Sequence, residues 1–128
     1  MEYYLEIFKN KYPIMFSKIT ILEMNSGWIK ILDDLCRELK NSDVVFSQIK
    51  EKFGELRVYY RRNKDIAAEK YLTDEEIDNL ILDATSLSIT TCEKCGSDNA
   101  ASTKYIGKEC WLKTLCTTCH DKYSETKI

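Results

Sequence analysis

The sequence contains little proline, glycine or histidine and no long apolar run. Its 128 residues include one Pro, four Gly and one His. So little Pro and Gly argues against long disordered linkers. No apolar stretch approaches the ~18–20 residues that a membrane-spanning helix needs, so we expect no membrane segment. The single histidine, His120, leaves almost no scope for a catalytic triad.

Targeting and nucleotide-binding signals are also missing. The N-terminal stretch MEYYLEIFKNKYP has no basic segment followed by an apolar one, which argues against secretion and favours a reducing cytoplasm. The chain has no glycine-rich phosphate-binding motif and no H-E-x-x-H motif. The acids of TDEEID are explained by the start of a helix. We therefore expect a protein that is not an enzyme, with a hydrolase or nuclease as the most distant alternative.

The composition is that of an ordinary soluble globular protein, with 44% hydrophobic and 31% charged residues. A chain of this length can form one modest core. The formal net charge is −2, and it becomes about −4 if four thiolates bind one Zn²⁺. The overall charge therefore does not favour binding to nucleic acid.

Two C-x-x-C pairs near the end of the chain carry the strongest chemical signal. Cys92 and Cys95 form one pair, and Cys116 and Cys119 form the other, with twenty residues between them. This spacing is typical of a zinc site. Gly96 follows the first pair and supplies the permissive backbone that such a turn needs. We predict about one Zn²⁺ per chain, in a closed shell of four thiolates that is structural rather than catalytic.

Other roles for the cysteines are less favoured. Disulfides are disfavoured in a reducing compartment. A thioredoxin-like motif would have a single C-x-x-C between a strand and a helix. Cys110 and His120 lie close enough in sequence to replace one of the four ligands, and this alternative stays open. Cys36 is expected to be a small buried side chain on a helix.

Hydrophobic periodicity predicts the elements of an α+β fold. We expect a short amphipathic helix over 2–11, ended by Pro13, and a second amphipathic helix from Ser26 as N-cap to about Asn41. The apolar residues at helical spacing on the second helix are Trp28, Ile31, Leu32, Leu35, Cys36 and Leu39. A third helix begins at Thr73 with a capping box. Its expected buried face consists of Ile77, Leu80, Ile81, Ala84 and Leu87.

Strands are predicted in two places. The segment around KFGE predicts an antiparallel hairpin, although residues 44–50 also fit the end of a helix. Two short strands around Gly107 and Lys108 would form a hairpin between the cysteine pairs, with Trp111 near the metal. We therefore predict helices packed on a small antiparallel sheet in residues 1–89, followed by a zinc-ribbon module in residues 90–128.

The charges are distributed unevenly. Residues 48–64 are basic and residues 65–83 are acidic. Arg57, Tyr59, Arg61 and Arg62 would combine guanidinium groups with an aromatic ring on the hairpin, which are the groups that bind phosphates and stack on bases. The simpler interpretation is that these side chains are charged because they face water or pair with the acidic segment. We favour this interpretation.

The order of motifs resembles a family of small uncharacterised proteins encoded by bacteriophages and prophages. The resemblance spans roughly residues 13–121 and depends on GWIKILDDLC, QIKEKFGELRVYY, TCEKCG and WLKTLCTTCHD. It implies an accessory protein that acts in the cytoplasm of the host bacterium, in host takeover or against a defence system. We expect a host protein as its partner, with a nucleic acid in phage transcription or replication as the alternative.

Overall fold

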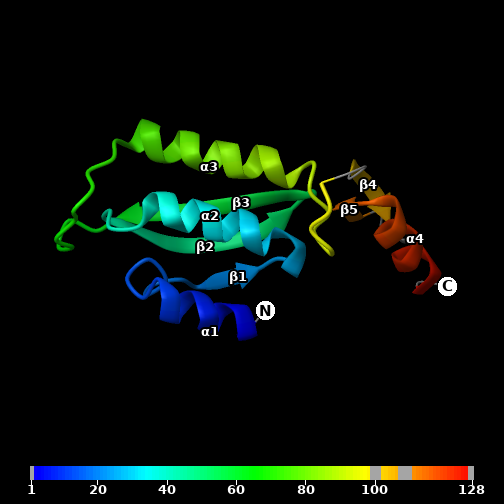
Figure 1. Cartoon of the computed structure of the whole chain (residues 1–128), viewed down its shortest axis with the longest axis horizontal. Coiled ribbons are helices and arrows are strands. Elements are labelled where there is room, and N and C mark those ends of the chain that lie inside the picture. The colour runs from blue at the N-terminus through cyan, green and yellow to red at the C-terminus, as the bar shows by residue number, and fades with distance from the viewer. Residues whose placement is uncertain (1, 99–101, 107–110, 127–128) are drawn as a thin grey trace.

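The computed structural model describes residues 2–98, 102–106 and 111–126, and it confirms the α+β class. Figure 1 shows three helices and a sheet, with a smaller hairpin and a fourth helix beyond one end of that sheet. The elements in chain order are α1 Glu2–Lys11, β1 Ile21–Glu23, the 3-10 helix η1 Ser26–Trp28, α2 Ile29–Leu39, β2 Val44–Lys52, β3 Glu55–Arg62, α3 Asp74–Ser88, β4 Ser102–Ile106, β5 Trp111–Leu115 and α4 Thr117–Thr126.

The larger sheet has the order β1-β2-β3. Strands β2 and β3 form the predicted antiparallel hairpin, which resolves residues 44–50 as strand. Strand β1 runs parallel to β2, a pairing that the sequence did not predict. The hairpin turns at Phe53 and Gly54, whose φ angles are 55° and 78°. Two consecutive positive φ angles match the twist of a two-residue hairpin, and the strands therefore stay paired up to Lys52 and Glu55.

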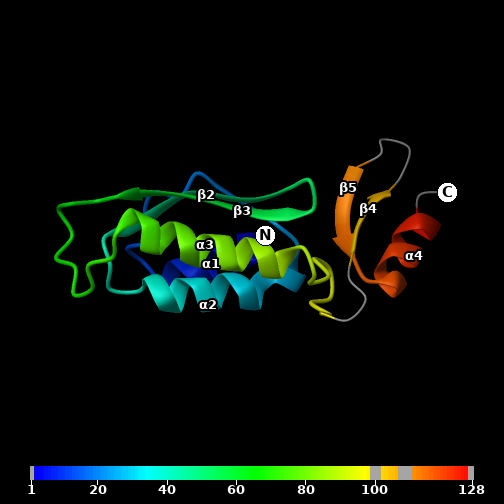
Figure 2. The ribbon, with the colours of Figure 1, turned by 90° about the horizontal axis from the view of Figure 1, so that it is seen from above.

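Helices α1, α2 and α3 all lie on one face of this sheet (Figure 2). Side chains from α2 fill the space between, because its apolar residues recur at helical spacing. The inward residues of β2 and β3 meet them from the sheet. The opposite face of β2 and β3 carries no helix among the described residues. The core residues of α2 and η1 are Trp28, Ile31, Leu32, Leu35, Cys36 and Leu39, as predicted.

The predicted start of α3 is confirmed. Thr73 accepts a hydrogen bond from the Glu76 amide, and the Glu76 side chain accepts one from the Thr73 amide. The predicted buried face is wrong at Leu87, which is 57% exposed. Ser88 is buried instead, and its Oγ accepts a hydrogen bond from the backbone N–H of Leu56 at 2.9 Å. The helix ends against the backbone of β3, and a polar side chain is needed there.

The prediction of Ser26 as N-cap of the second helix is also wrong. Residues Ser26–Trp28 form η1, and α2 begins at Ile29. The last turn of α2 is followed by Asn41, whose positive φ of 67° turns the chain away, as expected for a helix stop.

Helix α1 is attached to α2 through a partly buried carboxylate. Asp33 accepts hydrogen bonds from Lys11 Nζ at 2.7 Å and from the Tyr12 hydroxyl at 2.9 Å. Arg37 pairs with its second oxygen at 2.9 Å. Burial raises the pKa of Asp33, but the hydrogen bonds from Lys11 and Tyr12 outweigh it and the net pKa lies below the ordinary value. The ionised form of Asp33 therefore stabilises this attachment.

The C-terminal region consists of the antiparallel hairpin β4–β5 and helix α4. The hairpin is the one expected between the cysteine pairs. Helix α4 was not predicted, because its Thr, Ser and charged residues give it almost no apolar periodicity. The division of the chain at residue 90 stays a prediction. In the described part of the chain, none of the helices has the length and apolar character needed to cross a membrane.

Candidate metal centre

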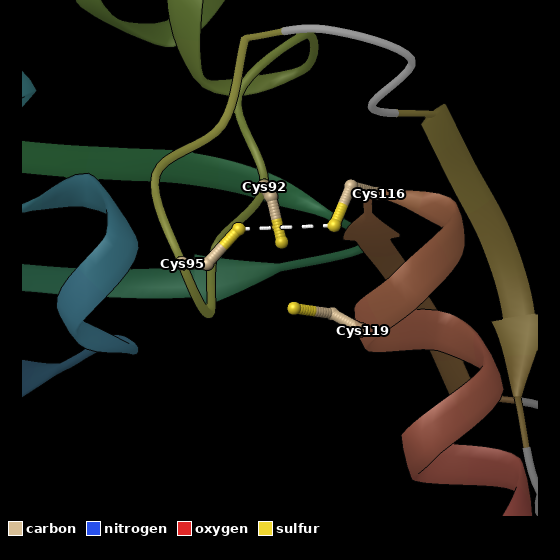
Figure 3. Close-up of side chains that lie close together, drawn as sticks. All are labelled: Cys92, Cys95, Cys116 and Cys119. Atoms are coloured by element: carbon tan, nitrogen blue, oxygen red, sulfur yellow. Dashed lines mark hydrogen bonds between the residues drawn. The ribbon is translucent and has the colours of Figure 1, made fainter.

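The four cysteines of the C-x-x-C pairs converge on one point. Their Sγ atoms all lie within 4.8 Å of one another, and each of these residues has a free thiol. Figure 3 shows Cys92 and Cys95 entering from the loop after α3, and Cys116 and Cys119 from the start of α4. The Sγ atoms of Cys95 and Cys116 are 3.7 Å apart. Four thiols in this arrangement could hold a metal ion.

Local backbone structure positions both cysteine pairs. The amide of Gly96 donates to the Cys92 carbonyl, and the Cys92 amide donates to the Ser97 carbonyl, both at 2.8 Å. Gly96 has a φ of 81°, a conformation that residues with a Cβ rarely adopt. In the second pair, the His120 amide donates to the Cys116 carbonyl at 2.9 Å, which forms the first turn of α4. Each turn directs two sulfurs to the same side.

The electrostatics of the cluster favour a cation. Burial raises the pKa of Cys92, but backbone hydrogen bonds at Cys116, Cys95 and Lys94 outweigh it and lower the pKa to about 6. Burial, followed by hydrogen bonds with the other thiols, raises the pKa of Cys119 to about 12. Cys92 therefore ionises most readily, and its negative charge opposes ionisation of Cys119. A bound metal cation would remove this opposition, since it binds thiolates.

The cysteine loop is attached to η1 through backbone contacts. The Gly27 amide donates to the Glu93 carbonyl at 2.8 Å, and Nε1 of buried Trp28 donates to the Thr91 carbonyl at 2.9 Å. A Cβ at Gly27 would collide with the carbonyl oxygen of Cys92 and lie 2.6 Å from the Glu93 carbonyl oxygen. Only glycine therefore permits this approach between η1 and the loop.

A second attachment joins β5 to the tip of the β2–β3 hairpin. Thr114 is buried and its Oγ1 donates to the Gly54 carbonyl at 2.7 Å. Lys113 Nζ lies 2.8 Å from Glu51 and 3.5 Å from the fully buried Glu93. Burial raises the pKa of Glu93 to about 7, although Lys113 acts in the opposite direction. Lys113 therefore bridges two carboxyl groups where the module meets the sheet.

The alternative ligands are placed differently. His120 does not belong to the cluster that the described residues form, and its Nδ1 lies 3.7 Å from the carboxylate of Asp121. Cys110, Gly107 and Lys108 lie outside the described residues, as does the side chain of Trp111. Cys36 is fully buried in the core of α2, as expected, and burial raises the pKa of its thiol.

The predicted binding face is only partly assembled. Arg57, Tyr59 and Arg61 alternate along β3 and share the face that carries no helix. Arg62 lies on the opposite face, which corrects its inclusion. Its guanidinium is 2.8 Å from Asp43 and 2.9 Å from Asp74, so it anchors the start of α3. A period of two along the strand could have separated Arg62 from Arg61.

Comparison of the chain with protein-family models, with curated proteins and with solved structures finds no match. Its function must therefore be inferred from the geometry of the centre and of the surfaces around it. Sequence spacing identified the four cysteines but missed Gly27, Glu93 and Lys113, which attach the centre to the core. No signal in the sequence marks these attachments, because they join segments far apart in the chain, as the 68-residue separation of Ser26 and Lys94 illustrates.

Proposed function

We propose that the four-cysteine centre binds one structural zinc ion. Sulfur donors from two C-x-x-C turns are the usual ligands of structural Zn²⁺, which prefers four of them in a tetrahedron. The observation that supports this proposal best is the convergence of all four Sγ atoms within 4.8 Å. Four protein ligands leave no position for water or substrate. The ion would therefore fasten the hairpin rather than catalyse a reaction.

The site couples zinc to the fold of the whole C-terminal module. The described hairpin strands have five residues each, so the module buries little surface of its own. Zinc would hold the loop at Cys92 against the start of α4. The same loop accepts the hydrogen bonds that come from Gly27 and Trp28. Metal binding is therefore expected to order the contact between the module and the sheet.

The zinc proposal is tested by elemental analysis of protein purified under reducing conditions. We expect about one zinc per chain, and loss of zinc in Cys119→Ser. Cys36→Ala is the matched control, because this cysteine lies in the core of α2 and should leave the zinc content unchanged. Absence of zinc from the wild-type protein, or full retention in Cys119→Ser, would contradict the proposal.

We further propose that the chain acts by binding rather than by catalysis, as an accessory protein of bacteriophage type in the host cytoplasm. Its partner is a macromolecule of the host, and the surface for it is the open sheet face. This name denotes the outward face of β2 and β3, whose polar and aromatic side chains are Gln48, Lys50, Lys52, Glu55, Arg57, Tyr59 and Arg61. The charge and exposure of this face support the proposal. The sequence favoured a protein partner, and that preference stays a prediction.

Capture from a bacterial lysate tests the binding proposal. The tagged wild-type chain is compared with a Lys50→Glu/Arg61→Glu variant, and each lysate is divided into nuclease-treated and untreated portions. We expect the wild type to enrich a partner that the variant loses. A partner that survives nuclease treatment would be a protein, and one that disappears would be a nucleic acid. Identical capture by both chains would contradict a role for the open sheet face.

A further inference from the structure

We infer that the open sheet face binds single-stranded nucleic acid. The inference rests on the proposed binding function and names its partner. Figure 2 shows that helices α1, α2 and α3 lie on the other side of β2 and β3. The open sheet face combines unpaired cations with exposed aromatic rings, and a single strand offers phosphates and unstacked bases to these groups.

The cations of this face have few competing acids. Within the described residues, Lys50, Lys52 and Arg61 form no ion pair, whereas Arg57 lies 3.1 Å from Glu55. A second carboxylate on this side of the sheet is Glu23, which is exposed on β1 opposite Lys50. Positive charge therefore predominates on the open sheet face.

The acidic segment lies elsewhere. Helix α3 carries Asp74, Glu75, Glu76 and Asp78 and packs on the helical side, where Asp74 binds Arg62 and Asp78 binds Tyr60. The fold thus places the acids of α3 on the side opposite the open sheet face, where Arg62 of the basic segment pairs with Asp74. A molecule with a net negative charge can still present one basic side to a polyanion.

Two aromatic rings accompany the cations. Tyr59 is 44% exposed at the middle of β3, and Lys50 Nζ lies 5.6 Å from its ring centroid. Phe53 is 62% exposed at the tip of the hairpin, with Lys52 Nζ at 5.5 Å. Each ring therefore has a cation beside it, and a base that stacks on the ring would have its phosphate near that cation. Phe53 also adopts a positive φ of 55°, which is uncommon for an aromatic residue.

A hollow continues the basic surface at the other end of the hairpin. Its volume is about 610 Å³, and its cations include Lys18, Arg61 and Lys64. Ser47 lies at an irregularity of the β2–β3 pairing and also lines the hollow, beside Gln48. Neutral hydrogen-bonding groups next to cations suit a sugar-phosphate backbone. Asp65 also lines the hollow and places a negative charge beside these cations.

The geometry favours a single strand over a duplex. Rings on a sheet can stack only on bases that are not stacked on each other, and duplex bases are not available. Aromatic rings also anchor protein interfaces, so the comparison of single strands with a nuclease-resistant partner is what separates the two kinds of ligand. The phosphates and bases that the cations and rings contact are common to DNA and RNA, so we expect both to bind.

Fluorescence anisotropy with labelled twelve-nucleotide oligo(dT) and oligo(rU) tests the inference on zinc-loaded, full-length protein. We expect both single strands to bind at low salt and a duplex of the same length to bind less tightly. Tyr59→Ala should weaken binding at least about fivefold, whereas Tyr59→Phe should keep it, because the ring is what stacks. Tyr3→Ala is the matched control, since Tyr3 is 71% exposed on α1 at the helical side.

The salt dependence supplies a second measurement. Arg61→Gln should reduce the slope of log affinity against log salt by about 0.7, the value for one phosphate contact on a single strand. Lys30→Gln on α2 removes the same charge from the helical side and should not change the slope. Circular dichroism and zinc content of each variant identify any loss of fold.

Several results would overturn the inference. Equal or tighter duplex binding would show that the rings do not stack, and it would leave the proposed binding function intact. Absence of oligonucleotide binding at low salt would also overturn it, and capture of a nuclease-resistant partner would then point to an acidic protein. The proposed binding function itself fails if substitutions on the open sheet face change neither oligonucleotide binding nor the set of captured partners.

Discussion

Replacement of Gly27 by alanine tests whether η1 and the cysteine loop are held in direct backbone contact. A Cβ at this position would meet the Cys92 carbonyl oxygen and the carbonyl group of Glu93, and both are backbone atoms. Neither can move aside as the end of a flexible side chain can. The substitution must therefore push the loop away from η1 or distort both.

The expected cost is set by the contacts that would be lost. Overpacking of a close contact costs ~1–3 kcal/mol. The hydrogen bond from Gly27 to Glu93 at 2.8 Å contributes about 1 kcal/mol more. The bond from Trp28 to Thr91 lies next to it and would lengthen. We expect Gly27→Ala to lower the free energy of unfolding by about 2–4 kcal/mol, which is roughly 10 °C in Tm.

Thermal and urea unfolding followed by circular dichroism measure this loss, and transfer of zinc to a colorimetric chelator measures the effect on the metal site. We expect faster zinc release, because the displaced loop carries two of the four thiols. Ser26→Ala is the matched control. Its Oγ makes only a long contact of 3.5 Å with the Lys94 carbonyl, so the change should cost less than about 0.5 kcal/mol. Wild-type stability and zinc release in Gly27→Ala would refute the proposed close contact.

Two further predictions concern partly buried charges. Asp33→Asn should lower stability by about 1–2 kcal/mol at pH 7. Because the pKa of Asp33 lies below its ordinary value, its contribution is present above pH ~4 and is lost as the pH falls through the lowered pKa. Urea unfolding of both proteins from pH 7 to 2 should therefore show the difference shrinking, and a constant difference would contradict this assignment. Lys113→Gln should destabilise the protein by about 3 kcal/mol, because the carboxylates of Glu51 and Glu93 lose their shared cation. Lys122 is exposed on α4, so Lys122→Gln is the control in thermal unfolding, and equal losses in both variants would exclude the ion cluster at Lys113.

Much of the fold could be predicted because local patterns determine it. The apolar spacing from Trp28 to Leu39 predicted the buried face of α2, and Thr73 with Glu76 predicted the start of α3. The prediction failed where long-range contacts decide the outcome. Leu87 lies at the edge of the apolar face of α3 by spacing and is exposed, whereas Ser88 is fully buried and bonds to Leu56. Strand β1 is only three residues long, which is too short to show a period.

The sequence by itself determined the candidate metal ligands and most of the elements that surround them. Two C-x-x-C turns specify four sulfurs because each turn is local, and only their meeting point depends on the fold. Tertiary structure alone decided which face of the sheet stays open. Strand alternation separates Arg61 from Arg62, but packing of α3 on the inner face is what keeps its acids away from the outer cations. Surface charge is a property of the folded arrangement, and the basic open sheet face therefore exists only once β2, β3 and α3 have come together.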